Sequence, residues 1–122
     1  MKLHNASCLD ILPTIEKSSI DLIFNDLPYN VTACSWDSLI PLDKLWKEYE
    51  RILKPDGIVL FTATQPFSSL VVMSNLKWFK YEWIWRKNQG TNPMMAKKQP
   101  LRNHEHVLVF SKNTPRYNPQ MW

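Results

Sequence analysis

The stretch DLIFNDLPYN, residues 21–30, contains the strand around which the predicted fold is built. Together with the preceding Ile20, its first residues form a run, Ile20 to Phe24, that is rich in β-formers and predicts a buried strand. The run gives way to Asp26, and Pro28 and Tyr29 follow directly. A turn needs no tyrosine and a buried strand needs no aspartate. The end of this strand is therefore a candidate for chemistry, although a strand-end turn with a fortuitous tyrosine is the alternative.

Further elements are predicted on both sides of this strand. Upstream, ASCLDIL predicts a helix start, in which Ser7 caps the helix, Asp10 completes a capping box and Pro13 keeps the helix short. Downstream, apolar spacing and turn residues predict a helix over 42–53, a turn at 54–57, a central parallel strand over 58–63, a weaker helix over 66–76, a half-exposed strand over 77–87, a long basic loop over 88–103, a strand over 104–112 and a tail over 113–122. This order predicts an α/β fold in a single domain, residues 1–122, with at least part of a parallel sheet.

Composition limits the class of protein. The chain has 122 residues, enough for one modest domain, and no apolar stretch approaches the ~20 residues of a membrane span. No secretory signal is evident at the start, and two cysteines are too few for a disulfide framework. We therefore expect a cytoplasmic protein that does not associate with membranes.

Positive charge is concentrated late in the chain. The net charge is +4, and the segment from Lys80 to Arg102 contains one acid, Glu82, against six basic residues: Lys80, Arg86, Lys87, Lys97, Lys98 and Arg102. Such a segment predicts a polyanion as partner, whereas a solvated lysine-rich loop is the alternative.

The groups that follow the first strand suit a planar ring with an amine. Ligands of open α/β sheets bind beyond the carboxyl ends of the strands, where Asp26, Pro28 and Tyr29 lie. Pro28 stiffens the loop and favours an extended Leu27. A carboxylate and a backbone carbonyl can each accept one N–H of an NH2 group, while a tyrosine can stack on the ring. The exocyclic amine of adenine or cytosine fits this set, provided that the base is flipped out of a duplex.

Four segments in order resemble the amino-group DNA methyltransferases, which methylate adenine N6 or cytosine N4 with S-adenosylmethionine. DLPYN at 26–30 resembles the catalytic motif of that family, and the other three are RILKPDGIVLFTATQPF, WIWRKNQGTN and NHEHVLVFSK. Their order is that of the β subgroup, in which the catalytic half precedes the cofactor half. The resemblance implies a partial Rossmann-like methyltransferase sheet in a three-layer fold, without the cofactor-binding strands.

The resemblance also implies roles for particular residues. Asp26 and the Pro28 carbonyl would accept the amine hydrogens, and Tyr29 would stack on the base. Phe61 and Thr62 would border the same pocket. Asp26 and, more weakly, Ser7 would contact the cofactor. DNA would lie against the basic residues Arg86, Lys87, Lys97, Lys98 and Arg102.

Three features depart from the family pattern. Leu27 replaces the usual first proline of the motif, which should loosen the loop slightly. Ser7 stands where relatives often carry a carboxylate that helps to hold the cofactor. The sequence reaches Trp122 without the glycine-rich cofactor turn, and neither Gly57 nor Gly90 belongs to such a turn. We therefore expect an incomplete catalytic domain, with the cofactor half on a second polypeptide in the split form.

Several interpretations stay open. The acidic Asp26 favours a site-specific DNA adenine-N6 methyltransferase in a truncated or split form. The alternatives are an inactive remnant or nucleic-acid-binding fragment, a cytosine-N4 enzyme, and an acceptor such as a glutamine side chain or an RNA base. No metal site is expected, because His104, His106 and Cys8 lack zinc spacing. Cys34 has no evident base partner and is not expected to be a nucleophile. The alternating aromatic residues Phe79 to Trp85 suit a core stripe better than a base-stacking surface.

Overall fold

A computed structural model describes residues 1–29, 39–91 and 93–121 of the chain. The elements are α1 (Cys8–Ile11), the 3-10 turn η1 (Leu12–Thr14), β1 (Ile20–Asn25), α2 (Leu42–Ile52), β2 (Leu53–Ala63), α3 (Phe67–Ser74), β3 (Phe79–Thr91), the 3-10 turn η2 (Pro93–Met95) and β4 (Arg102–Phe110). The strands form one sheet in the order β1-β2-β4-β3. The α/β class is therefore as predicted, with β2 in the interior of the sheet.

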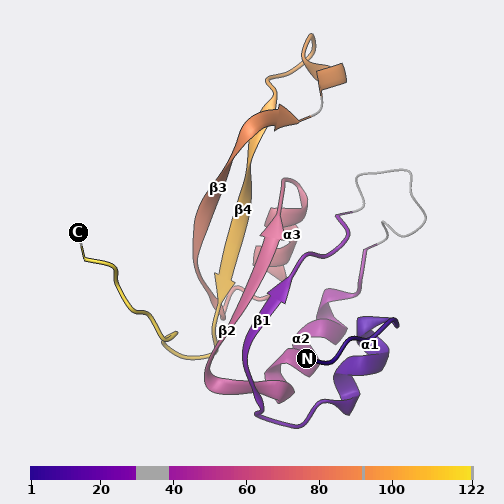
Figure 1. Cartoon of the computed structure of the whole chain (residues 1–122), viewed down its shortest axis with the longest axis vertical. Coiled ribbons are helices and arrows are strands. Elements are labelled where there is room, and N and C mark those ends of the chain that lie inside the picture. Colours follow the sequence, from indigo (N-terminus) through magenta and orange to yellow (C-terminus); the bar gives the residue numbers. More distant parts are fainter. Residues whose placement is uncertain (30–38, 92, 122) are drawn as a thin grey trace.

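The directions of the strands bring the important segments to one edge (Figure 1). β1 and β2 are parallel, whereas β4 is antiparallel to β2 and β3 is antiparallel to β4. The carboxyl ends of β1 and β2 therefore lie at the same end of the sheet as the connection between β3 and β4. The loop that carries Asp26 and the basic hairpin both project from this edge.

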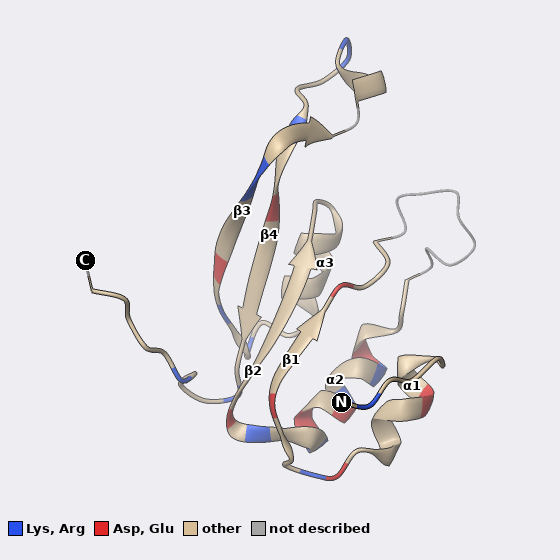
Figure 2. Ribbon diagram, viewed as in Figure 1, with Lys and Arg blue, Asp and Glu red and all other residues tan. Residues whose placement is uncertain are grey.

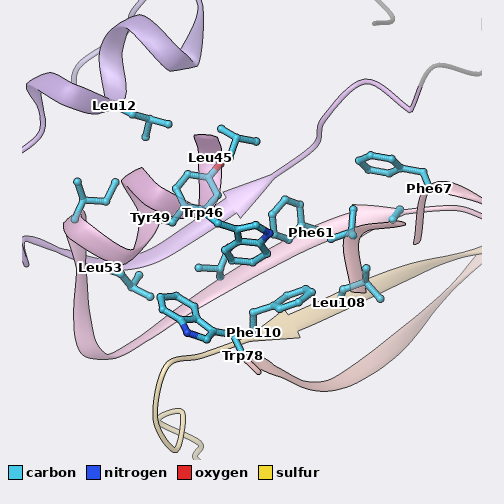
Figure 3. Packing of buried hydrophobic residues seen from close by; sticks show 14 residues of the cluster. Leu12, Leu45, Trp46, Tyr49, Leu53, Phe61, Phe67, Trp78, Leu108 and Phe110 are labelled. Atoms are coloured by element: carbon cyan, nitrogen blue, oxygen red, sulfur yellow. The ribbon is translucent and has the colours of Figure 1, made fainter. Parts of the chain in front are cut away.

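One face of the sheet packs against the helices (Figure 3). Val59 and Phe61 of β2 and Leu108 and Phe110 of β4 lie in a single core cluster with residues of η1, α2 and α3. Trp46 of α2 is central to the cluster, because its ring contacts those of Tyr49, Phe61, Trp78 and Phe110. Of the three layers expected for the complete fold, the described residues provide the sheet and one layer of helices.

The two edge strands expose apolar side chains that the sequence analysis placed in the core. β1 was expected to be buried, but Leu22 is 54% exposed and Phe24 is 61% exposed. The expectation that the β3 aromatic residues belong to the core holds for Phe79, which packs against the core cluster. It is wrong for Trp83 and Trp85, which follow a register shift and are half-exposed. Both strands have the predicted extended conformation. The described part of the chain places no helix over the side of the sheet to which these residues point.

Three local predictions also need correction. Residues 54–57 form no turn, because they belong to β2 and continue the parallel ladder beside an irregularity of β1. The loop predicted over 88–103 is shorter, because β3 continues to Thr91 and β4 begins at Arg102. Ser7 does occupy the N-cap position of α1, but its side chain makes no capping hydrogen bond.

The remaining features agree with the predictions or extend them. α1 is a single turn, as Pro13 predicted, and α2, α3 and β4 lie close to the expected ranges. The tail after β4 is joined to the sheet through Arg116, which pairs with Asp56 at 2.8 Å. None of the described helices is both long enough and apolar enough to cross a membrane.

Candidate functional site

Asp26 lies directly beyond the carboxyl end of β1 and is held by the neighbouring strand. The Thr62 hydroxyl of β2 donates a hydrogen bond to Asp26 Oδ1 at 2.7 Å. Because β1 and β2 are parallel, the ends of the two strands meet, and the Asn25 carbonyl lies 3.4 Å from the same hydroxyl. The Asp26 side chain stays exposed, and among the described residues only its Oδ1 has hydrogen-bond partners.

Tyr29 connects this strand end with α3. Its hydroxyl lies 3.0 Å from Thr62 Oγ1 and 3.3 Å from Asp26 Oδ1, and it can donate to either. Its ring stacks on Phe67, with 5.1 Å between centroids and 27° between planes. Burial is the main cause that raises the pKa of Tyr29 to about 12, and the Asp26 charge adds to it. Tyr29 is therefore a neutral, oriented aromatic group beside a carboxylate.

The two residues between Asp26 and Tyr29, Leu27 and Pro28, differ in their contacts. Leu27, which replaces a proline of the family motif, packs partly buried against the core cluster. This packing restrains the loop that the substitution was expected to loosen. Within the described residues, no donor contacts the Pro28 carbonyl.

Asn25 is a supporting residue that the sequence analysis missed. The Tyr49 hydroxyl of α2 donates to Asn25 Oδ1 at 2.5 Å, and Asn25 Nδ2 donates to the Leu60 carbonyl at 3.1 Å. Asn25 is buried, so these bonds satisfy an amide that would otherwise be costly to bury. Two features of the sequence could have indicated this pair: an Asn that ends an apolar strand, and a Tyr among the apolar residues of the helix that follows.

The predicted nucleic-acid residues all lie on the β3–β4 hairpin (Figure 2). Lys97 and Lys98 occupy its tip, Arg86 lies on β3, and Arg102 begins β4. All four side chains are exposed, and none forms an ion pair with a described carboxylate. Lys87 differs, because its ammonium pairs with Glu105 and lies over the Trp85 ring.

An open pocket joins this hairpin to the end of β2. It has a volume of about 650 Å³, and its walls come from the start of α3 and from the hairpin: Gln65, Pro66, Thr91, Gln99, Pro100, Leu101, Arg102 and His104. Gln65 and Pro66 directly precede Phe67, on which Tyr29 stacks. The hairpin and the Asp26 loop thus belong to one edge of the molecule.

Of the other candidates, Ser7 is not brought to this end of the sheet by a described contact, and the two histidines form no three-ligand group with described residues. Ser7 is exposed at the start of α1, and within the described residues its side chain makes no hydrogen bond. His106 pairs with Glu82 at 2.8 Å, and its ring is 5.5 Å from that of His104. No group of three metal-ligating side chains occurs in the described ranges. Cys34 lies outside the described residues.

The two glycines serve the packing of the chain itself. A Cβ on Gly57 would lie 2.6 Å from Leu53 Cγ, and a Cβ on Gly90 would lie 2.9 Å from Leu101 Cβ. Neither glycine is therefore shaped to admit a ligand against the backbone. Of the residues expected to contact the cofactor, Asp26 carries a negative charge that suits a positively charged group. The described residues supply no glycine-rich turn.

The sequence was compared with family models and with known proteins. A family model described as DNA methylase, for N6 and N4 methyltransferases, matches residues 20–122. The type II methyltransferase M1.MboII of Moraxella bovis is 29% identical over 124 residues, which cover 92% of this chain and 46% of the relative. M.HpaI of Haemophilus parainfluenzae is 25% identical over 129 residues, which cover 95% of this chain and 40% of the relative. The chain thus spans less than half the length of these relatives.

Solved structures share the fold at low sequence identity. The M1.HpyAVI–SAM complex superposes with a TM-score of 0.65 at 18% identity, over 93% of this chain and 54% of the other. The cytosine-N4-specific PvuII DNA methyltransferase gives a TM-score of 0.69 at 16% identity, over 91% of this chain and 49% of the other. The four-stranded sheet and its helices therefore correspond to about half of these folds.

Proposed function

The chain belongs to the DNA methylase family of N6 and N4 methyltransferases, and from this premise we propose that it carries the target-amine half of a DNA adenine-N6 methyltransferase. The match to about half of each relative supports the proposal of a partial enzyme. The methyl donor would be S-adenosylmethionine, and DNA would be the substrate.

The observation that carries this proposal is the fixed arrangement of Asp26, Pro28 and Tyr29. Thr62 holds one oxygen of Asp26, so the carboxylate is oriented before a substrate arrives. The second carboxylate oxygen of Asp26 and the Pro28 carbonyl, which accept no hydrogen bond from another described residue, can accept the two hydrogens of an exocyclic amine. The amine nitrogen is a poor nucleophile, because its lone pair is delocalised into the ring. Holding both hydrogens favours a tetrahedral nitrogen, and the carboxylate stabilises the positive charge that develops there.

Asp26 also supports adenine as the target base. A carboxylate at the first position of this motif is typical of the adenine enzymes that the sequence resembles, whereas cytosine-N4 enzymes usually carry serine there. The Tyr29 ring, backed by Phe67, would supply the stacking surface for the flipped base.

S-adenosylmethionine would supply the methyl group. Of the chain's own residues, Asp26 would contribute negative charge toward the cofactor, and Ser7 would contribute at most a hydroxyl. Gly57 and Gly90 are both close to leucine side chains of this chain, so neither is placed to form the glycine-rich cofactor turn.

A nucleoside titration tests the amine site on the chain by itself. Adenosine and cytidine would each be titrated into labelled protein, and chemical shifts of Tyr29, Asp26 and Thr62 would be followed by NMR. We expect adenosine to shift these signals in the millimolar range and Asp26→Ala to weaken binding at least about tenfold, because hydrogen bonds to a charged group contribute roughly 1.5–3 kcal/mol. The matched control is Asp21→Ala, which removes an exposed carboxylate near the other end of β1.

Tritium transfer from labelled S-adenosylmethionine to DNA, by the chain joined to the cofactor-binding half of a relative, tests the reaction, followed by separation of the methylated nucleosides. We expect N6-methyladenine, and a loss of at least about a hundredfold in the Asp26→Ala variant. N4-methylcytosine would show that the assignment of the base is wrong. Unchanged transfer by Asp26→Ala would remove the role assigned to that residue.

A further inference from the structure

The open pocket between the start of α3 and the β3–β4 hairpin takes no part in the amine chemistry proposed above. We call it the hairpin pocket. Its apolar lining comes from Pro66, Pro100 and Leu101, and its polar side chains are those of Gln65, Thr91, Gln99, Arg102 and His104. Each of these polar side chains can donate a hydrogen bond, and among the described residues no acidic side chain lines the pocket. Such a lining suits an anion that also carries some apolar surface.

Arg102 supplies the positive charge of the hairpin pocket. Its side chain is exposed and forms no ion pair with a described carboxylate. The acidic residues of β3 and β4, Glu82 and Glu105, pair instead with His106 and Lys87. The planar guanidinium of an arginine matches the oxygen atoms of a phosphate and can bind two of them at once. The anion that this pocket fits best is therefore a phosphate group.

Two hydrogen bonds arrange the walls of the hairpin pocket before a ligand arrives. The Ser69 hydroxyl donates to Gln65 Oε1 at 2.7 Å, which turns the amide so that its NH2 group is left to donate elsewhere. The Thr91 hydroxyl donates to the Arg102 carbonyl at 3.1 Å, which ties the end of β3 to the start of β4. The pocket thus has an oriented amide donor on one wall and an anchored arginine on the other.

We propose that the hairpin pocket holds a phosphodiester of the DNA backbone. The Arg102 guanidinium and the Gln65 amide would bind the phosphate oxygens, and the adjoining deoxyribose would lie against Pro100 and Leu101. The pocket has a volume of about 650 Å³, which admits a sugar together with the phosphate. This proposal rests on the function proposed above and names the part of the substrate that a second site would take.

The register of the sheet places this phosphate away from the target base. Thr62, which holds Asp26, pairs with Val107, whereas Arg102 begins β4. At the usual rise of a strand these positions are about 17 Å apart along β4. Phosphates follow one another by about 3.4 Å along each strand of B-DNA, so the bound phosphate would lie several nucleotides from the target. A contact of this kind fixes the position of the duplex without reading its sequence.

A titration with one isolated phosphodiester tests the hairpin pocket. The probe is an abasic dinucleotide, which has one phosphodiester and no base, and the control ligand is the same compound with an uncharged methylphosphonate linkage. NMR would follow the side-chain N–H signals of Gln65 and Arg102 in the full chain. We expect the probe to shift these signals in the millimolar range and the control ligand to bind at least about tenfold more weakly, because hydrogen bonds to a charged group are the stronger ones.

Three variants separate the pocket from a general effect of charge. Arg102→Gln removes the cation, and Gln65→Glu keeps an acceptor for Ser69 but replaces the amide donor with a negative charge. We expect each to weaken the probe at least about tenfold. Lys47→Gln, on the exposed side of α2, changes the net charge equally and should leave the affinity unchanged. All three side chains are exposed, so the midpoints of urea unfolding should stay close to that of the unmodified chain.

Duplex DNA shows whether the pocket acts on the proposed substrate. Arg102→Gln should make the slope of log K against log salt concentration shallower by about 0.9, the value for one phosphate, and Lys47→Gln should not change it. The proposal is wrong if that slope stays the same in Arg102→Gln, if the methylphosphonate binds as tightly as the probe, or if Lys47→Gln weakens the probe as much as Arg102→Gln.

The hairpin pocket and the amine site can fail separately. Adenosine should still shift the signals of Asp26 and Tyr29 in the Arg102→Gln variant, because neither residue lines the hairpin pocket. If the probe binds and adenosine shifts neither signal, the result would count against the proposed function and would leave the phosphodiester site supported.

Discussion

Tyr29 shows how much of the site depends on one side chain. Its hydroxyl is within hydrogen-bonding distance of both Thr62 and Asp26, and its ring packs on Phe67. The side chain thus links β1, β2 and α3 at the edge where a ligand would bind. Burial disfavours the phenolate, and the Asp26 carboxylate repels it, so the native arrangement requires a neutral tyrosine.

This dependence predicts a loss of stability at high pH. The pKa of Tyr29 is raised from 10.0 to about 12 in the folded chain. The stabilisation is therefore complete below about pH 10 and is lost as the pH rises through about 12. Burial also raises the pKa of Tyr49, which acts in the same direction. Urea denaturation between pH 9 and 12 should show a falling free energy of unfolding.

Absorbance at 295 nm, which follows the formation of phenolate, tests whether the loss of stability at high pH comes from Tyr29. Tyr29→Phe should remove one phenolate that appears near pH 12 and should reduce the fall in stability. The same substitution at Tyr117, which is exposed, should leave that late step intact. A Tyr29→Phe variant with an unchanged late titration would contradict the assignment.

At the scale of the element, the start of β2 depends on Gly57. Its missing Cβ would lie 2.6 Å from Leu53 Cγ and 3.0 Å from the Lys54 carbonyl. Leu53 is buried, so it has little room to move, and Gly57→Ala should lower the free energy of unfolding by roughly 1–3 kcal/mol. Gly90→Ala is the comparison variant, because its obstacle, Leu101 Cβ at 2.9 Å, belongs to a half-exposed residue outside the core, so that any backbone shift stays in the hairpin. Equal midpoints in urea for the two variants would contradict this account.

The elements also show what the sequence could predict. Alternation and apolar runs predicted the strands, and the carboxyl end of β1 was correctly placed as the position of Asp26. Periodicity gives the two faces of a strand but does not say what covers each, so β1 and the Trp83–Trp85 part of β3 were wrongly expected to be buried. Lys54–Gly57 has the composition of a turn, but pairing with β1 holds it in a strand. Long-range partners such as Asn25 and Tyr49 become evident only in three dimensions.

The whole molecule separates its apolar and its charged surfaces. The face of the sheet opposite the helices carries exposed apolar side chains of β1 and β3 and the paired charges of Lys87 and Glu105, whereas the exposed cations of the hairpin lie beyond the end of the sheet that carries Asp26 (Figure 2). On this arrangement, DNA would approach the Asp26 loop from the hairpin side.

Salt dependence provides the test of this arrangement. Each neutralised phosphate of duplex DNA contributes about −0.9 to the slope of log K against log salt concentration. Lys97 and Lys98 have no described acidic partner, so replacing both with alanine should make the slope shallower by about 1.8, twice the value for one phosphate. Fluorescence anisotropy of a labelled duplex between 50 and 200 mM salt would give both slopes. Lys44→Ala with Lys47→Ala removes two exposed cations of α2 and should leave the slope unchanged. Equal changes in the two double variants would mean that DNA is attracted by net charge alone and that the hairpin does not form a specific contact surface.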